Sequence, residues 1–223
     1  MGTVYNIAAK ENMIIAEKIL PSQALGNVVE FEVPEKLKQK ELPSKVDNSE
    51  NKFFRPIFLQ VGGSCGQASG VGYTFTYEIN YARNFDASLP ENQYPTHYTY
   101  NFLNGGNANV GSWYLDAWDI IRANGCPDLV TYGGSIAAMG EKYWMDGYDK
   151  YYSAMKNKVE AIYFQKVDTP EGLENLKWWL YNHGDENALY GGVATFAAGV
   201  GGGEYTESLL PVNTPHAGAL VIT

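Results

Sequence analysis

The sequence predicts an α+β protein, with helices dominating early and strands late. Three segments carry apolar residues at helical spacing, and two later segments are apolar runs of strand length. The helical segments are 68–82, 112–124 and 169–184, and the strand candidates are 191–199 and 216–223. At 223 residues the chain is long enough for one sizeable domain or two small lobes, with a substantial core.

The first forty residues read as a lead segment distinct from the main domain at 41–223. Short apolar runs such as NVVEFEV alternate there with the charged stretch PEKLKQKELPSK. This pattern favours a strand-rich or extended arm that ends in a linker. The start of the chain has no basic region followed by an apolar one, so we expect no signal peptide in it.

The first helix places a cysteine at its N-terminus. Helical spacing begins just after Gly66, and Ser64 or Gly63 stands where a capping residue is expected. Cys65 is therefore predicted at or near the helix start. The apolar positions of this helix are Ala68, Val71, Phe75, Ile79 and Ala82.

The other helices have clear end signals. Leu115, Trp118 and Ile121 form one stripe in the second helix, and Gly125 ends it. Thr169 is the expected N-cap of the third, with Pro170 at its first position. The two strands follow, GGVATFAAG and then HAGALVIT.

Charge and cysteine content exclude several classes of function. The formal net charge is −9, and the whole deficit lies after residue 55, which argues against a nucleic-acid partner. No run of about 18 apolar residues occurs, so we expect no membrane span. Two cysteines, Cys65 and Cys126, allow at most one disulfide and no thiolate zinc cluster. We expect no metal and no cofactor, and we expect Cys126 to be a packed thiol.

The surroundings of Cys65 favour nucleophilic chemistry. A thiol attacks as the thiolate, which a helix N-terminus and a nearby imidazolium both stabilise. Glycines before Cys65 leave room for backbone N–H groups to face an oxyanion, and the side-chain amide of Gln60 could donate to it as well. These are three parts of an acyl-transfer site.

The missing part is a base, and the chain has three histidines. His183 lies in the closing turn of the third helix, where a structural capping role is expected. His97 lies in a polar aromatic stretch that reads as a loop, where a surface or hydrogen-bonding role is expected. His216 opens an apolar strand and follows Cys65 by 151 residues. That separation is close to the roughly 130 to 150 residues between nucleophile and histidine in papain-like enzymes.

The stretch LPSKVDNSENKFFRPIFLQVGGSCGQAS resembles the mature N-terminus of the papain family of cysteine peptidases. Further segments resemble that family in the same order, over roughly residues 42–223. They are PENQYPTHYTYNFLNGGN, WYLDAWDIIRANG, GGVATFAAG and PHAGALVIT. The resemblance implies a two-lobe fold, with a helical lobe, a β-rich lobe and the site between them.

The resemblance also implies the roles of individual residues. Cys65 would be the nucleophile, His216 its base and later the acid, and Gln60 part of the oxyanion hole. Gly105 and Gly106 would form the backbone strip along which an extended substrate binds, with Gly63 and Ser64 beside the nucleophile. Residues 1–40 would be a propeptide remnant or an N-terminal arm. The function implied is hydrolysis of peptide bonds in a peptide or protein substrate, in a secreted, periplasmic or cell-surface protein.

The sequence departs from the family pattern in several places. Gln60 stands one residue closer to the cysteine than usual, and Gly66 replaces the aromatic residue that normally follows it. The chain stops at Thr223, before the family's Asn-Ser-Trp-Gly segment. The second lobe is therefore expected to be incomplete, with a further chain or segment completing it. The alternatives are a transferase or ligase with the same chemistry, and an inert papain-like module that binds peptides or glycans.

Overall fold

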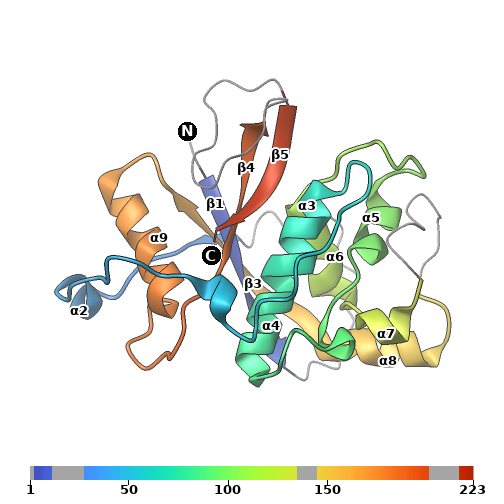
Figure 1. Cartoon of the computed structure of the whole chain (residues 1–223), viewed down its shortest axis with the longest axis horizontal. Helices are drawn as coiled ribbons and strands as arrows, with labels where there is room; N and C mark the ends of the chain where they lie inside the picture. The colour runs from blue at the N-terminus through green and yellow to red at the C-terminus, as the bar shows by residue number, and fades with distance from the viewer. Residues whose placement is uncertain (1–2, 12–27, 135–144, 201–215, 223) are drawn as a thin grey trace.

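The protein combines helices with one mixed β-sheet, as Figure 1 shows. The computed structural model describes residues 3–11, 28–134, 145–200 and 216–222. The sheet has five strands in the order β2-β3-β1-β4-β5. The strands are β1 (Thr3–Glu11), β2 (Val28–Glu30), β3 (Asn157–Lys166), β4 (Ala194–Val200) and β5 (His216–Ile222). The α+β class predicted from the sequence is confirmed at this level.

The centre of the sheet is formed by β1. It pairs antiparallel with β3 on one side and with β4 on the other. At the two edges, β2 runs parallel to β3 and β5 runs antiparallel to β4. The lead segment 1–40 therefore supplies two of the five strands, including the one that joins both halves of the sheet. The expected order of early helices and late strands was wrong in this respect.

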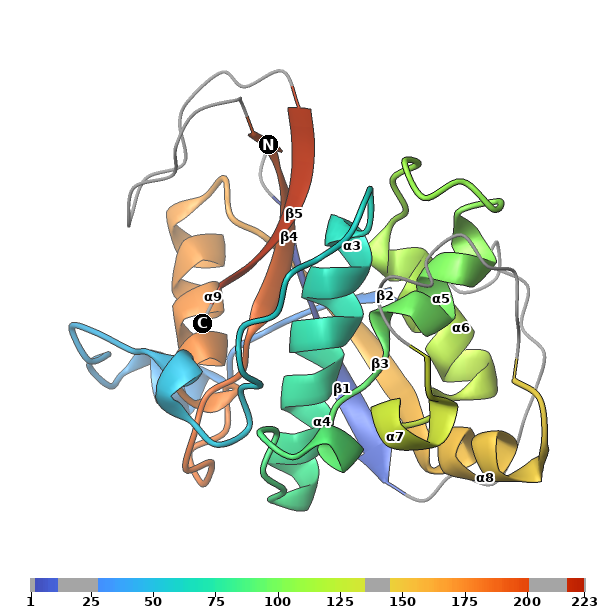
Figure 2. The same ribbon diagram turned by 45° about the vertical axis from the view of Figure 1, so that its right-hand side comes forward.

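One long helical run crosses the sheet, as Figure 2 shows. It consists of α3 (Cys65–Gln67), the π-helical η3 (Ala68–Phe75) and α4 (Thr76–Arg83). A side chain at Gly70 would place its Cβ 2.4 Å from Cβ of Tyr114, so this glycine allows close helix packing. The run ends at Asn84, which adopts the left-handed conformation with φ 58°. The predicted first helix is confirmed.

Both other predicted helices are present. α6 (Tyr114–Asn124) ends at Gly125, and α9 (Pro170–Asn182) begins after Thr169, whose side chain accepts a hydrogen bond from the Gly172 N–H. The remaining helices of the described residues are α2 (Glu35–Lys38), η2 (Asn48–Glu50), η4 (Pro90–Asn92), α5 (Thr96–Leu103), α7 (Leu129–Tyr132) and α8 (Tyr148–Lys156). Within the described ranges, no helix is long and apolar enough to cross a membrane.

Separate apolar cores lie on the two faces of the sheet. On one face the long helical run and α6 pack against β3, where Ile162 is buried. On the other face α9 covers β3, where Tyr163 contacts a cluster that includes Trp179. Successive residues of β3 thus point to opposite faces, as the pleat of a strand requires. Figure 1 shows α9 on one side of the sheet and α3, α4 and α6 on the other.

Candidate functional site

Cys65 is the first residue of the long helical run, as predicted, and it is a free, partly exposed cysteine. Ser64 occupies the N-cap position, but its side chain does not cap the helix. Its buried hydroxyl donates instead to the Val61 carbonyl at 2.8 Å. The Ser64 carbonyl accepts from the N–H groups of Gln67 and Ala68, each at 2.9 Å. Local hydrogen bonds therefore hold the turn before Cys65, and the cysteine lies at the N-terminus of the helical run.

The glycines around Cys65 make room for a neighbouring loop. A Cβ at Gly62 would lie 2.0 Å from the Ala108 carbonyl oxygen, and a Cβ at Gly66 would lie 2.1 Å from that of Ser112. Both distances are far below contact, so a side chain at either position would displace the loop. The Gly63 N–H also donates to the Ala108 carbonyl at 2.8 Å. The glycines before Cys65 were expected to leave room for an oxyanion. The backbone of this neighbouring loop fills part of that room.

Buried polar side chains hold the same loop, residues 104–112, in place. Gln67 donates from Nε2 to Ser112 Oγ at 3.0 Å and to the Trp113 carbonyl at 3.1 Å. The Tyr100 hydroxyl lies within hydrogen-bond distance of the Ala108 carbonyl, at 2.7 Å, and burial raises the pKa of this tyrosine. The sequence does not mark Gln67 and Tyr100 as parts of the site, because both lie in helices at positions typical of residues that only pack.

Gly105 and Gly106 lie in this loop, just after α5. Both have positive φ, 63° and 86°, and both are exposed. The Gly106 N–H donates to Asn104 Oδ1 at 2.7 Å, which closes a tight turn. A Cβ at Gly105 would meet nothing within 4 Å. The loop thus presents open backbone, and its contact with Gly63 brings it next to the Cys65 turn.

The remaining members of the predicted site lie on two other segments. Gln60 is exposed in the irregular stretch before the turn. His216 is the first residue of β5, where its backbone pairs with Val200, and its side chain lies outside what the structure describes. β5 runs beside α3, as both views show (Figures 1 and 2). The fold therefore brings the helix of Cys65 and the strand of His216 together.

The other two histidines have structural partners. His183 ends α9 in the left-handed conformation, and its ring lies between Glu78 Oε2 at 2.8 Å and the Tyr190 carbonyl at 3.0 Å. The predicted capping position is confirmed, but the buried Glu78 was missed, since nothing in the local pattern marks it. His97 was predicted in a loop and lies instead in α5. It is buried, with Nε2 2.9 Å from the Gly133 carbonyl, and burial lowers its pKa.

Cys126 is a fully buried free thiol, as expected of a packed cysteine. Burial raises its pKa well above the ordinary value, with a smaller contribution from Asp128. A protonated thiol is a poor nucleophile, so Cys126 is an internal reference for the reactivity of Cys65. Over residues 3–11, 28–134, 145–200 and 216–222, no group of three acidic, histidine or cysteine side chains is arranged to hold a metal ion.

Comparison of the chain with protein-family models, with curated proteins and with solved structures finds no significant match.

Proposed function

We propose that the protein is a papain-like cysteine peptidase, with a helical lobe, a β-rich lobe and Cys65 as the nucleophile. One observation carries the proposal. A free, partly exposed thiol stands at the start of a long helical run, and that helix lies beside the strand that begins at His216. A helix N-terminus stabilises a thiolate, and histidine is the side chain that exchanges a proton most readily near neutral pH.

The reaction divides into two steps. The Cys65 thiolate attacks the substrate carbonyl, and negative charge develops on the carbonyl oxygen. The Cys65 N–H and the Gln60 amide donate to that oxygen, as preorganised donors do in acyl transfer. The intermediate collapses as the C–N bond breaks, and the His216 imidazolium gives its proton to the leaving amine. Water, deprotonated by the neutral imidazole, then hydrolyses the thioester, and the freed thiolate regains its imidazolium partner.

The exposed loop beside Cys65 would bind the substrate backbone. Gly105 and Gly106 present peptide groups without side chains, so an extended peptide can pair with them as an added strand. Asn tolerates positive φ, and open space surrounds Gly105, so Gly105→Asn should fold normally. We expect this variant to raise KM for peptide substrates while Cys65 alkylation by iodoacetamide stays unchanged. Unchanged KM would remove this loop from the substrate site.

Alkylation by iodoacetamide and by an epoxysuccinyl probe between pH 4 and 9 tests the nucleophile. We expect Cys65 to be labelled rapidly at pH 6, where an ordinary thiol with a pKa of about 8.5 reacts slowly. Cys65→Ala should abolish labelling and cleavage of a fluorogenic peptide, and His216→Ala should slow both by about tenfold or more. Cys126→Ala is the matched control and should change neither rate.

Labelling of Cys65 that follows an ordinary thiol, with no effect of His216→Ala, would reject the peptidase. The inert binding module would then be the better proposal, to be tested by titration with peptides and glycans. If labelling succeeds but peptide cleavage is weak, an added amine distinguishes a transferase. Formation of a new amide with that amine would show that an acceptor other than water resolves the thioester.

A further inference from the structure

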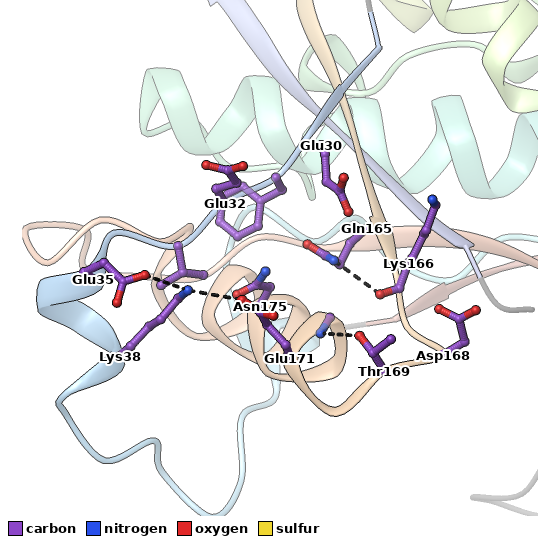
Figure 3. A pocket seen from close by; sticks show the side chains of 13 residues that line it. Glu30, Glu32, Glu35, Lys38, Gln165, Lys166, Asp168, Thr169, Glu171 and Asn175 are labelled. Carbon is purple, nitrogen blue, oxygen red and sulfur yellow. Dashed lines mark hydrogen bonds and ion pairs between the residues drawn. The ribbon is translucent and has the colours of Figure 1, made fainter.

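A cavity lies away from Cys65, where α2, the end of β3 and the start of α9 meet. Its volume is about 460 Å³, which is within the range of small-molecule sites. Most of the charged side chains that line it are carboxylates, as Figure 3 shows. The acidic residues are Glu30, Glu32, Glu35, Asp168 and Glu171, and the basic ones are Lys38 and Lys166. The side chains that line the cavity therefore carry a negative net charge.

Two residues that line this cavity have a buried amide oxygen without a hydrogen-bond donor in the described part of the chain. They are Oε1 of Gln165, on β3, and Oδ1 of Asn175, on α9. Gln165 is 3% exposed and Asn175 is 8% exposed, so neither is a surface side chain. Gln165 donates from Nε2 to the Lys166 carbonyl at 3.2 Å, which fixes the orientation of its amide, and Figure 3 shows Oε1 on the side of the amide that faces away from Lys166 and toward Glu32. Buried acceptors without donors are rare, and each calls for an explanation.

The ammonium group of Lys38, which lines this cavity, is paired with two of its carboxylates. The Lys38 ammonium lies 2.9 Å from Glu35 Oε1 and 3.4 Å from Glu171 Oε1. The hydrogen bond that Lys38 donates to Glu35 is the largest cause of the raised pKa of Lys38, and Glu171 adds to the rise. Two carboxylates that line the cavity thus stabilise a positive charge, while the two buried amide oxygens lack donors among the described residues.

We propose that this cavity binds a guanidinium group. A guanidinium carries a permanent positive charge and five N–H donors in one plane, and it has no acceptor. It can therefore donate to amide oxygens from two different elements and to the carboxylates at the same time. An alkylammonium offers three donors, all on one nitrogen atom. A metal ion is not favoured, because the described residues contain no group of three acidic, histidine or cysteine side chains arranged to hold one. The guanidinium can belong to a free small molecule or to an arginine side chain of a polypeptide.

Titration of the full chain with butylguanidine, followed by the side-chain amide NMR signals of Gln165 and Asn175, tests the proposal. We expect saturable shifts of these signals, and binding about tenfold weaker for butylamine of the same length. Binding should weaken as salt is added, because exposed carboxylates supply much of the attraction. No saturable shift, equal affinity for butylamine, or tighter binding of Ca²⁺ would each overturn the proposal.

Variants separate the site from its surroundings. Gln165→Met and Asn175→Leu remove the amide oxygens with little change of volume, and each should weaken butylguanidine binding about tenfold or more. Asn175→Leu should not lower the melting temperature, because no hydrogen bond to Oδ1 is lost. Gln165→Met also removes the hydrogen bond from Nε2 to the Lys166 carbonyl, so a small decrease is expected there. Glu32→Gln, at an exposed position, provides a variant whose folding is not in question and should also weaken binding. Glu174→Gln is the control, because Glu174 is exposed on α9, next to Asn175 in the chain, and does not line the cavity.

The source of the group is resolved by comparing free butylguanidine with an arginine-containing peptide and its lysine counterpart. Binding of the arginine peptide at least tenfold tighter than butylguanidine would assign the site to a polypeptide, and equal binding would assign it to a small molecule. Equal binding of the lysine and arginine peptides would contradict the proposal. All of these readouts are independent of Cys65, so the guanidinium site can fail while the peptidase stands, and the reverse.

Discussion

We predict that Asp119 lowers the stability of the folded protein at neutral pH. It lies on α6, only 7% exposed, and its Oδ1 has no hydrogen-bond donor in the described residues. Burial raises the pKa of Asp119 from 3.8 to about 6, while Arg122 acts in the opposite direction and Asp116 adds to the rise. Its neutral isostere, Asp119→Asn, removes the charge and keeps the shape of the side chain.

The magnitude follows from the two pKa values. The difference between 3.8 and about 6 is about 2 units, or about 3 kcal/mol at 1.36 kcal/mol each. Because the folded pKa is the higher one, the cost is fully present above about pH 6 and disappears as the pH falls below about 4. A buried asparagine keeps part of the desolvation cost of a polar group. We therefore expect Asp119→Asn to stabilise the protein by about 1 to 2 kcal/mol at pH 8 and much less at pH 4.

Urea unfolding of both proteins at pH 4 and pH 8, followed by tryptophan fluorescence, measures this difference. Other groups also titrate in this range, but they are common to both proteins and cancel in the comparison. Asp149→Asn, at an exposed position on α8, should show no pH-dependent gain. The reasoning would be refuted if Asp119→Asn were less stable than the original protein at pH 8. It would also be refuted if the substitution changed the free energy of unfolding equally at pH 4 and pH 8.

Three shorter predictions follow from the packing. Gly125→Ala should destabilise the fold by about 3 kcal/mol or more in urea unfolding, because its φ is 78° and a Cβ would lie 1.8 Å from the Ala154 carbonyl oxygen. Glu78→Ala should cost about 3 to 5 kcal/mol, because it removes the buried carboxylate that bonds the partly buried His183 ring and the Val193 N–H, and Glu78→Gln should cost less, because an amide can still bond the ring. Cys126 should react with Ellman's reagent only after denaturation, since burial raises its pKa; reaction in the native protein would contradict its burial.

Helices with strong end signals were predictable from the sequence. Thr169 and Pro170 mark the start of α9 through effects that act within one turn, a side-chain cap and a fixed φ. Gly125 ends α6, and it also packs against the Ala154 carbonyl, which no local pattern reveals. Local rules thus placed the helix ends, and the reasons for some of the residues there became visible only in the packed structure.

The central strand was not predictable in the same way. Thr3–Glu11 pairs with β3 and β4, so Val4 lies opposite both Gln165 and Phe196. These partners are more than 150 residues away along the chain, and a window of sequence contains no information about them. The apolar and charged runs of the first forty residues therefore suggested an arm, although part of that stretch holds the sheet together.

The glycines near Cys65 differ in why the structure needs them: packing requires some of them, and one has no such requirement. Gly62 and Gly66 face the carbonyls of loop 104–112 at distances that no side chain could tolerate, so packing alone requires both. Gly105 has positive φ but nothing within 4 Å of its Cβ position, so neighbouring atoms do not exclude a side chain there. Function is therefore better tested at Gly105, because a change at Gly62 or Gly66 would move the loop whatever the site does. The same reasoning favours Asn175 in the cavity between α2 and α9, because no hydrogen bond to its amide oxygen is lost when it is replaced.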